Sequence, residues 1–321
     1  MITGYFDPTG GNSIGIDVKT LDYTIEFEND PAIATASAST IIVEDNMDGS
    51  VFDLASFTPK EIRIGKHTIS VPESHHFVKT FDMRPEIQCI AEISFDYDSE
   101  IGKALWKFES LDPVTLNPII DFRQGLLPVN NETGCGVGFI DYSINLKDNL
   151  QHNATVDNKA VITFDDNKPI ETPTWSNVTD YKRPESMIIR NDGYSDGHYA
   201  LTVEFSDEGS GIHSYDLCIR TSDNDKWHVV MTGLTDREIR FETPEAIPGI
   251  QFTTIATDRA GNRQIYSDSV SGIDDFVLDN NHDDSEPQRW YNLQGIPISD
   301  FEDYKVPGII ISNKGKKIIV R

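Results

Sequence analysis

Two short loops carry the residues whose types and spacing could do chemistry. The first reads "SDEGSG" and contains Asp207 and Glu208, and the second reads "ATDRAGN" and contains Asp258 and Asn262. Carboxylate and amide oxygens are the hard ligands that Ca²⁺ prefers. If folding brings the two loops to one end of a β-sandwich, these four residues form a candidate calcium site; apart from this candidate we expect no cofactor. The alternative is that Asp258 and Asn262 only cap a turn by binding backbone amides.

A weaker calcium candidate and two superficial motifs complete the list of possible sites. The weaker candidate is "FDDNKP", with Asp165, Asp166 and Asn167. The segment "GCGVG" has no strand-to-helix context, so it predicts a tight turn and no phosphate site, and its cysteine has no histidine nearby. The adjacent histidines in "ESHHF" would point to opposite faces of an extended chain, so they make a poor chelating pair.

The motifs of common enzymes are missing from the sequence. It lacks GxSxG, HExxH, GxxxxGK[ST] and GxGxxG. Asp and Glu are so abundant that no pair of them identifies a catalytic site. A hydrolase would need two opposed carboxylates or a Ser/His pair in a cleft, and it is the least favoured class. We therefore expect no catalytic residues and no enzyme activity.

Charge and cysteine content exclude several classes of protein. The 321 residues include 53 Asp and Glu against 27 Lys and Arg, a formal net charge of −26. This surplus repels nucleic acids and anionic membrane surfaces, so neither is an expected partner. Three cysteines without CxxC spacing predict free thiols, buried in the strands at Cys89 and Cys218. No apolar stretch reaches the roughly 18 residues of a membrane helix.

The dominant hydrophobic period is two, which predicts β-strands. Segments such as "YTIEFEN", "ALWKFES", "GFIDYSINL" and "AVITF" alternate apolar and polar residues between clusters of Gly, Pro, Asn and Asp. A second series runs from "HYALTVEFS" to "IQFTTIATD" and has the size of one small sandwich. We expect an all-β fold of two tandem antiparallel β-sandwiches plus a short C-terminal β tail.

Composition divides the chain further. Pro169 and Pro173 close the last strand of the first series, and a polar segment follows. Residues 274–303 hold nine acidic side chains and one basic side chain, which is typical of a flexible acidic linker. The expected parts are a larger sandwich at 1–175, a smaller sandwich at 176–272, a linker at 273–289 and a β tail at 290–321.

The end of the chain resembles a known export signal. "YNLQGIPIS…VPGIIISNKGKKIIVR" is similar to the C-terminal tails of surface and secreted proteins that use the type IX secretion system. The resemblance implies that the tail is an address read by the export machinery. The alternative is a final hairpin whose basic side chains balance nearby carboxylates. The residues that match the pattern are Tyr291, Gly295, Pro307, Gly308, Lys316, Lys317 and Arg321.

The two loops of the calcium candidate belong to a second resemblance. "SDEGSGIHSYDLCIR…ATDRAGN" is similar to the immunoglobulin-like and fibronectin type III-like modules of large bacterial adhesins and extracellular enzymes. In such modules the corresponding loops lie at the same end of the sandwich. Gly209 and Gly211 would allow the tight turn. Phe252 stands where many such modules have Tyr, so the hydroxyl bond of a tyrosine corner is not expected.

The first part of the chain resembles repeats of giant bacterial surface proteins. "LDYTIEFEND", "GLLPVNNETGCGVGFIDYSI" and "AVITFDDNKPIETP" are similar to strands of those repeats. The resemblance implies a structural or adhesive module without catalysis. It also implies an extracellular or cell-surface location, and other domains of a longer chain as partners. "MITGYFDPTGG" is no signal peptide, so we expect the natural chain to continue upstream of Met1.

The expected function is therefore a non-catalytic structural or adhesive module of an exported bacterial surface protein, present as a monomer, with host or glycan surfaces as further possible ligands. The alternative is a glycan-binding accessory module of a secreted carbohydrate-active protein. That alternative needs a row of exposed aromatic rings on which sugars stack. The four tryptophans are Trp106, Trp175, Trp227 and Trp290. The first and third lie on alternating strands, so a core position is expected for both.

Overall fold

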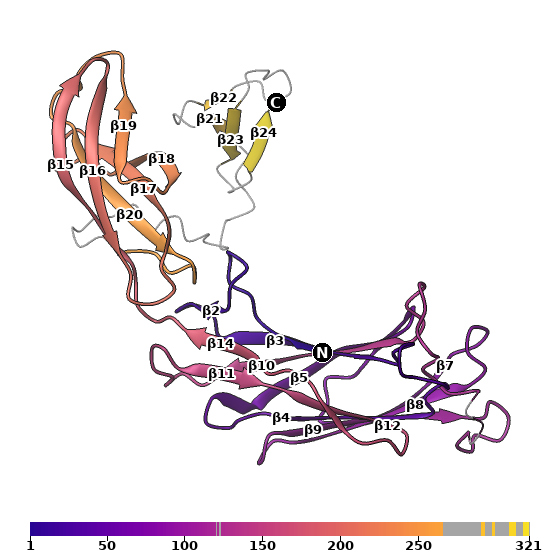
Figure 1. Cartoon of the computed structure of the whole chain (residues 1–321). Helices are drawn as coiled ribbons and strands as arrows, with labels where there is room; N and C mark the ends of the chain where they lie inside the picture. Colours follow the sequence, from indigo (N-terminus) through magenta and orange to yellow (C-terminus); the bar gives the residue numbers. More distant parts are fainter. Residues whose placement is uncertain are drawn as a thin grey trace, which may run out of the picture.

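The structure is a computed structural model that describes residues 1–119, 121 and 123–265, together with four short strands beyond them. The described residues form β-strands, turns and loops without an α-helix, which confirms the predicted all-β fold. No described helix is long and apolar enough to cross a membrane. Figure 1 shows two separate packed units, with the smaller one beyond β2 and β14 of the larger.

Two antiparallel sheets form the larger sandwich. The first sheet has the order β1-β3-β10-β5-β6 and the second has the order β13-β12-β4-β9-β8-β7. A short third sheet, β11-β14-β2, lies beside them. The strands are β1 Ile2–Thr3, β2 Ser13–Ile14, β3 Thr20–Glu28, β4 Thr40–Asn46, β5 Phe52–Ile64, β6 His67–Ser70, β7 His76–Asp82, β8 Ile90–Asp98, β9 Lys103–Leu111, β10 Val137–Leu146, β11 Thr155–Asn158, β12 Ala160–Phe164, β13 Ile170–Glu171 and β14 Trp175–Thr179.

The core of the larger sandwich follows from the alternation of its strands. In β4 and β9 every second side chain is buried between the two sheets, while its neighbours face outward. Trp106 on β9 is 1% exposed and lies in an aromatic layer with Phe95, Phe57 and Tyr142. Burying each such side chain stabilises the fold by about 1.5–3 kcal/mol. Cys89 is a buried free thiol in this core, as predicted.

The smaller sandwich packs two three-stranded sheets, β15-β16-β19 and β18-β17-β20. Its strands are β15 Glu185–Ser195, β16 His198–Ser206, β17 Ile212–Arg220, β18 His228–Leu234, β19 Glu238–Glu242 and β20 Gln251–Asp258. The sequence pattern located β16 and β17 at these bounds but did not indicate β15. The buried side chains between the sheets are Leu201, Val203, Tyr215, Leu217, Ile239 and Ala256.

A second buried cluster covers the outer side of the β18-β17-β20 sheet. It consists of Cys218, Ile255 and Trp227, and Trp227 lies in the connection between β17 and β18. The guanidinium carbon of Arg220 lies 4.5 Å from the centre of the Trp227 ring. Cys218 is buried and free, as predicted, because this cluster shields its thiol.

Several predicted parts lie partly outside the described residues. The predicted acidic linker, 273–289, lies entirely outside the described residues. The same holds for four residues of the predicted tail, Gly295, Pro307, Lys316 and Arg321. The tail contributes β21 Trp290–Asn292, β22 Pro297–Ile298, β23 Gly308–Ser312 and β24 Lys317–Val320, which form one sheet of order β22-β21-β23-β24. The division at residue 175 stays a prediction, and β14, which starts there, pairs with β11 and β2 of the larger unit.

Candidate functional site at the junction of the two sandwiches

Three carboxylates meet where the two sandwiches join. Asp180 directly follows β14, Asp207 directly follows β16, and Asp258 is the last residue of β20. One oxygen of each lies within 4.8 Å of the others. Asp180 and Asp258 are 2% and 1% exposed, so two of the three carboxylates are shielded from water. The structure thus brings Asp207 and Asp258 together, as the calcium prediction required, and adds Asp180 from the other sandwich.

The glycine-rich loop "SDEGSG" wraps around two of these carboxylates with its backbone amides. Ser210 donates its N–H to Asp180 Oδ2 at 2.6 Å, while Gly209 and Gly211 donate to Asp207 Oδ2 at 3.0 and 2.7 Å. A Cβ on Gly209 would lie 2.2 Å from Asp180 Oδ1, so only glycine permits this approach. The amides supply positive partial charge where the carboxylates crowd together.

Asp258 and Asn262 form a closed turn beside this loop. Asp258 Oδ1 accepts the Asn262 backbone N–H at 2.7 Å, and Asp258 Oδ2 accepts the Asn262 side-chain amide at 2.8 Å. Burial raises the pKa of Asp258 to about 6, the bonds from Asn262 lower it, and the charges of Asp180 and Asp207 raise it further. The turn-capping alternative for these two residues is therefore present in the structure.

Asn262 also connects the two sandwiches. Its Oδ1 accepts the backbone N–H of Ile16 at 2.7 Å, and its Nδ2 donates to the carbonyls of Asp180 and Lys182 at 2.8 and 3.0 Å. The side chain is 4% exposed, so these bonds are shielded from water. Asn262 therefore binds both the linker and the N-terminal segment.

Glu208 does not join the cluster. Its side chain is 76% exposed and forms an ion pair with Lys182 at 3.2 Å. The sequence suggested Glu208 because it neighbours Asp207, but Glu208 lies in the bend after β16 with its side chain turned to solvent and to Lys182. Asp180 was missed because it lies in the polar connection between the sandwiches, 27 positions before Asp207, where no pattern marks it.

The arrangement has two chemical outcomes. Three carboxylates this close repel one another unless a cation or a shared proton offsets their charge. Oxygen ligands suit Ca²⁺, and Asp207 Oδ1 is buried without a hydrogen bond, so it offers a ligand position. The other oxygens already accept bonds from the loop, from Asn262 or, for Asp180 Oδ1, from the Lys182 backbone N–H, and they would ligate with their remaining lone pairs. The donor set fits a calcium ion that Asp180, Asp207 and Asp258 would hold.

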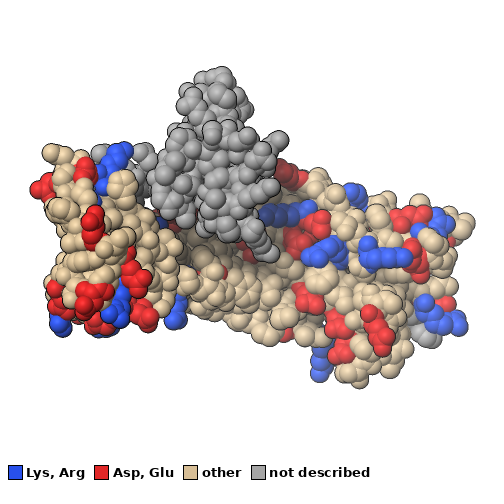
Figure 2. Space-filling model, turned by 90° about the horizontal axis from the view of Figure 1, so that it is seen from above, with Lys and Arg blue, Asp and Glu red and all other residues tan. Residues whose placement is uncertain are grey.

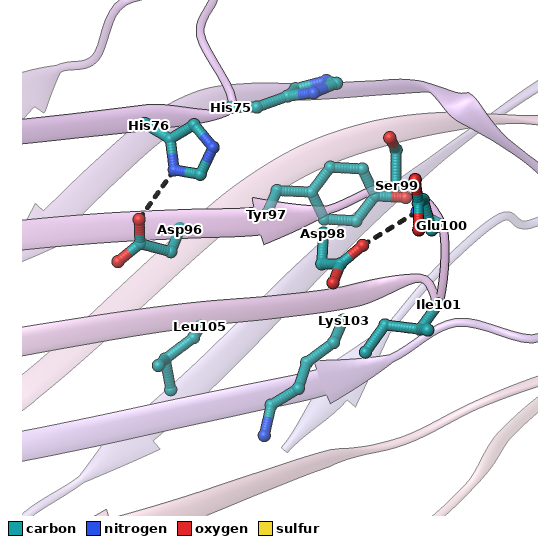
Figure 3. Close-up of a pocket in the computed structure, with 10 residues that line it drawn as sticks. All are labelled: His75, His76, Asp96, Tyr97, Asp98, Ser99, Glu100, Ile101, Lys103 and Leu105. Atoms are coloured by element: carbon teal, nitrogen blue, oxygen red, sulfur yellow. Dashed lines mark hydrogen bonds and ion pairs between the residues drawn. The ribbon is translucent and has the colours of Figure 1, made fainter.

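The pocket in Figure 3 lies elsewhere, on the β7-β8-β9 face of the larger sandwich, and has a volume of about 530 Å³. His76 Nδ1 lies 2.7 Å from Asp96 Oδ1, while His75 Nε2 lies 3.3 Å from the Phe57 carbonyl. The two histidines therefore have different hydrogen-bond partners, but both line this pocket, whereas the sequence predicted that they would point to opposite faces. Ser99 lies across the pocket from His76 in this view.

The remaining sequence candidates are structural. The glycine loop opens β10, and a Cβ on Gly138 would lie 2.2 Å from the Phe27 ring. Cys135 donates its S–H to the Val129 carbonyl at 3.7 Å. Asp165 accepts two backbone N–H groups, from residues 39 and 40, at 2.9 and 2.8 Å, and Asn167 binds a carbonyl of its own turn. The "FDDNKP" segment is therefore a capped turn.

The aromatic and charged side chains bear on whether the chain can offer a glycan-binding surface. Trp106 and Trp227 are 1% and 8% exposed, so neither offers a face to a sugar. Trp175 is half-buried against Phe6, with ring centres 4.8 Å apart, and the side chain of Trp290 lies outside the described residues. Basic side chains lie among acidic ones on the face that Figure 2 shows. No row of exposed aromatic rings is found in residues 1–119, 121 and 123–265.

A family model described as "Domain of unknown function (DUF7619)" matches residues 115–178, which is less than half of the chain. No curated protein matches the sequence.

Solved structures similar to this chain are β-rich modules of bacterial proteins. They include fibronectin(III)-like modules of Clostridium thermocellum CbhA (12% identity, 83% of this chain and 90% of that chain, TM-score 0.30). The C-terminal domain of the Streptococcus pyogenes antigen I/II-family protein AspA has 12% identity over 79% of this chain and 88% of that chain, with a TM-score of 0.34. A collagen-binding domain of a Staphylococcus aureus adhesin has 12% identity over 56% and 95%, with a TM-score of 0.28. These TM-scores are too low to indicate a shared function.

Proposed function

We propose that this chain is a non-catalytic spacer and scaffold module of an exported bacterial surface protein, in which two sandwiches are held at a fixed orientation. The observation that carries the proposal is the buried junction built on Asn262. It replaces the solvated linker that independently moving domains would have. This role needs no catalytic pocket, because a spacer acts only by holding its neighbours at a fixed distance and angle.

The junction is fixed from both sides. Beyond the Asn262 bonds, Asp180 donates its backbone N–H to the Ile14 carbonyl at 2.7 Å, so the linker is paired with the N-terminal segment. Arg183 donates to the Arg263 carbonyl at 2.7 Å. Freeing the smaller sandwich would break the bonds that Asn262 forms with Ile16 and Asp180, and losing such a shielded bond costs about 1–3 kcal/mol. A fixed orientation is therefore the favoured state.

Small-angle X-ray scattering of Asn262→Ala tests the proposal. We expect the wild type to fit one compact arrangement and the variant to show a broader distribution of interdomain distances. Asn149→Ala, an exposed substitution on the larger sandwich, is the matched control and should scatter like the wild type. If the wild type already shows the broad distribution, the fixed orientation is wrong.

Export and surface location form the second part of the proposal, and the resemblance of the tail supports them. The test is a fusion of residues 285–321 to a reporter in a cell with type IX secretion. A reporter on the cell surface supports the proposal, and a reporter retained in the periplasm contradicts it. A double variant of the fusion, Arg321→Glu with Lys316→Glu, tests the basic terminus. It should reduce export if the export machinery recognises these basic side chains.

We also propose that Ca²⁺ strengthens the junction by binding Asp180, Asp207 and Asp258. Binding at ten times the dissociation constant would stabilise the fold by about 1.4 kcal/mol. The melting temperature should therefore be higher in millimolar Ca²⁺ than in EDTA. Asp207→Asn should reduce this difference, because Asp207 offers the oxygen without a hydrogen bond. Exposed Asp166→Asn should retain it, and equal midpoints in both buffers would exclude the ion.

A further inference from the structure

The core of the larger sandwich contains a carboxyl group that the junction does not involve. Asp45 lies on β4, is 0% exposed, and faces the opposite sheet at the position where Ile41 and Val43 also point inward. Around it lie Tyr142 of β10, Asn158 of β11 and the aromatic layer that contains Trp106. A carboxyl group at such a position must be either paired or neutral, because an isolated buried charge is strongly disfavoured.

The hydrogen bonds of Asp45 all reach one of its oxygens. Asp45 Oδ2 accepts the Tyr142 hydroxyl at 2.5 Å and the Asn158 side-chain amide at 3.1 Å. Asp45 Oδ1 is buried and has no hydrogen-bond partner. The hydroxyl of Tyr23, whose ring stacks on Tyr142 at 5.5 Å, is also buried without a partner. The unpaired Oδ1 is where a proton would reside in the neutral acid.

Among the described residues, the titratable groups that face Asp45 are tyrosines. Its titratable neighbours are Tyr23 of β3, Tyr142 of β10 and Tyr97 of β8, and Asp157 of β11 acts on Tyr23. No ion pair joins Asp45 to a Lys, Arg or His within the described part of the chain. Burial raises the pKa of Asp45 to about 7, although the bonds from Tyr142 and Asn158 lower it. Desolvation therefore outweighs the two hydrogen bonds.

We infer that the larger sandwich folds around Asp45 as a neutral carboxylic acid, so that its folding takes up one proton and it is most stable in mildly acidic solution. An unfolded chain exposes Asp45 to water, where it ionises near pH 4. Between pH 4 and pH 7 the folded state therefore binds more protons than the unfolded state. Stability falls as the pH rises through this window and becomes constant above it, by at most about tenfold per pH unit in the folding equilibrium.

The experiment compares the full wild-type chain with Asp45→Asn across the pH range. Asparagine has the shape of aspartate and cannot ionise, so its carbonyl can accept the bonds from Tyr142 and Asn158 without charge. The ratio of the wild-type to the variant folding constant should fall by up to about tenfold per unit between pH 5 and pH 7 and then level. Hydrogen exchange of β4 and β10 amides restricts the measurement to this sandwich. Asp166→Asn, an exposed exchange of the same kind, should give a ratio without this fall.

A second measurement does not depend on a variant that folds. The ¹³Cγ chemical shift of Asp45 in the wild type should be that of a carboxylic acid at pH 5 and should move to that of a carboxylate near pH 7. The signal can be assigned by its change in Tyr142→Phe. A carboxylate shift at pH 5, or a folding ratio that is constant from pH 5 to pH 8, would overturn the inference.

Discussion

The two sandwiches solve the problem of burial differently. The larger one packs a five-stranded sheet on a six-stranded sheet around a continuous aromatic layer. The smaller one packs three strands on three, and part of its apolar surface lies on the outside of a sheet under Trp227. The larger core is wide enough to enclose Asp45, while the smaller unit keeps its buried acid, Asp258, at its edge against the other sandwich. Size thus decides where each unit can bury an acidic side chain.

This difference predicts a different dependence on single side chains. In the larger sandwich each buried side chain belongs to one large core. The smaller sandwich depends on a few buried residues, on the outer cluster of Trp227, Cys218 and Ile255, and on the junction. The following changes test that contrast, from the largest expected effect to the smallest.

Trp106→Ala should give the largest loss. It removes the biggest fully buried side chain and leaves a cavity among Phe95, Phe57 and Tyr142, with an expected cost of about 3–5 kcal/mol. Urea unfolding followed by hydrogen exchange should show faster opening of β4 and β9 while β17 and β20 stay protected. Trp106→Phe, which fills most of the space, should lose much less. Equal losses in both sandwiches would mean that they unfold as one unit.

Leu217→Ala makes the matching change in the smaller sandwich. Leu217 is 0% exposed on β17, and its truncation should cost about 3 kcal/mol. Because this core is small, we expect a separate low-temperature transition by calorimetry, with the transition of the larger sandwich unchanged. Leu217→Met is the volume-conserving control and should keep a single profile close to that of the wild type.

Arg220→Ala should weaken the outer cover of the smaller sandwich. The guanidinium stacks on Trp227 and donates to Gln251 Oε1 at 2.6 Å, so we expect a loss of about 1 kcal/mol and a more solvent-exposed Trp227. Fluorescence quenching by iodide should increase for the variant. Arg220→Lys keeps the charge but not the planar contact and should lie between the two. Unchanged quenching would show that Trp227 is held without Arg220.

Glu208→Ala should have the smallest effect. Its exposed ion pair with Lys182 predicts a change within about 0.5 kcal/mol, measured by urea unfolding. The melting difference between Ca²⁺ and EDTA should also match that of the wild type, in contrast to Asp207→Asn. If Glu208→Ala lost the calcium response, Glu208 would be a calcium ligand, as the sequence suggested.

Alternation of apolar residues was sufficient to predict the central strands. β12 coincides with "AVITF", and β16 and β17 coincide with the segments read from the sequence. Two long strands were missed for physical reasons. β15 is an edge strand whose side chains are mostly exposed, so its sequence does not alternate. β5 contains Pro59 and a register shift against β10, which breaks the period.

The candidate site was half predictable. Loop resemblance brought Asp207, Asp258 and Asn262 together, but nothing local in "NVTDYKRP" identified Asp180, since its role depends on how the two sandwiches meet. The same applies to Asp45: the alternation in "IIVEDN" places it inward, yet only the packing of the opposite sheet shows that its partner is Tyr142 and that no cation of the described residues pairs with it. Contacts between distant segments are set by tertiary structure, which periodicity does not describe.

The bond between Ile16 and Asn262 joins positions 246 apart, and β2 pairs with β14 by matching Ser13 to Val178. A ribosome makes the first of these partners long before the second, so the hinge between the sandwiches can close only after nearly all of the described chain has emerged. Anyone who expresses a shortened version that starts beyond residue 16 would keep most strands of both cores. Such a fragment would nevertheless lack the N-terminal segment whose bond to Asn262 sets the angle between the two sandwiches.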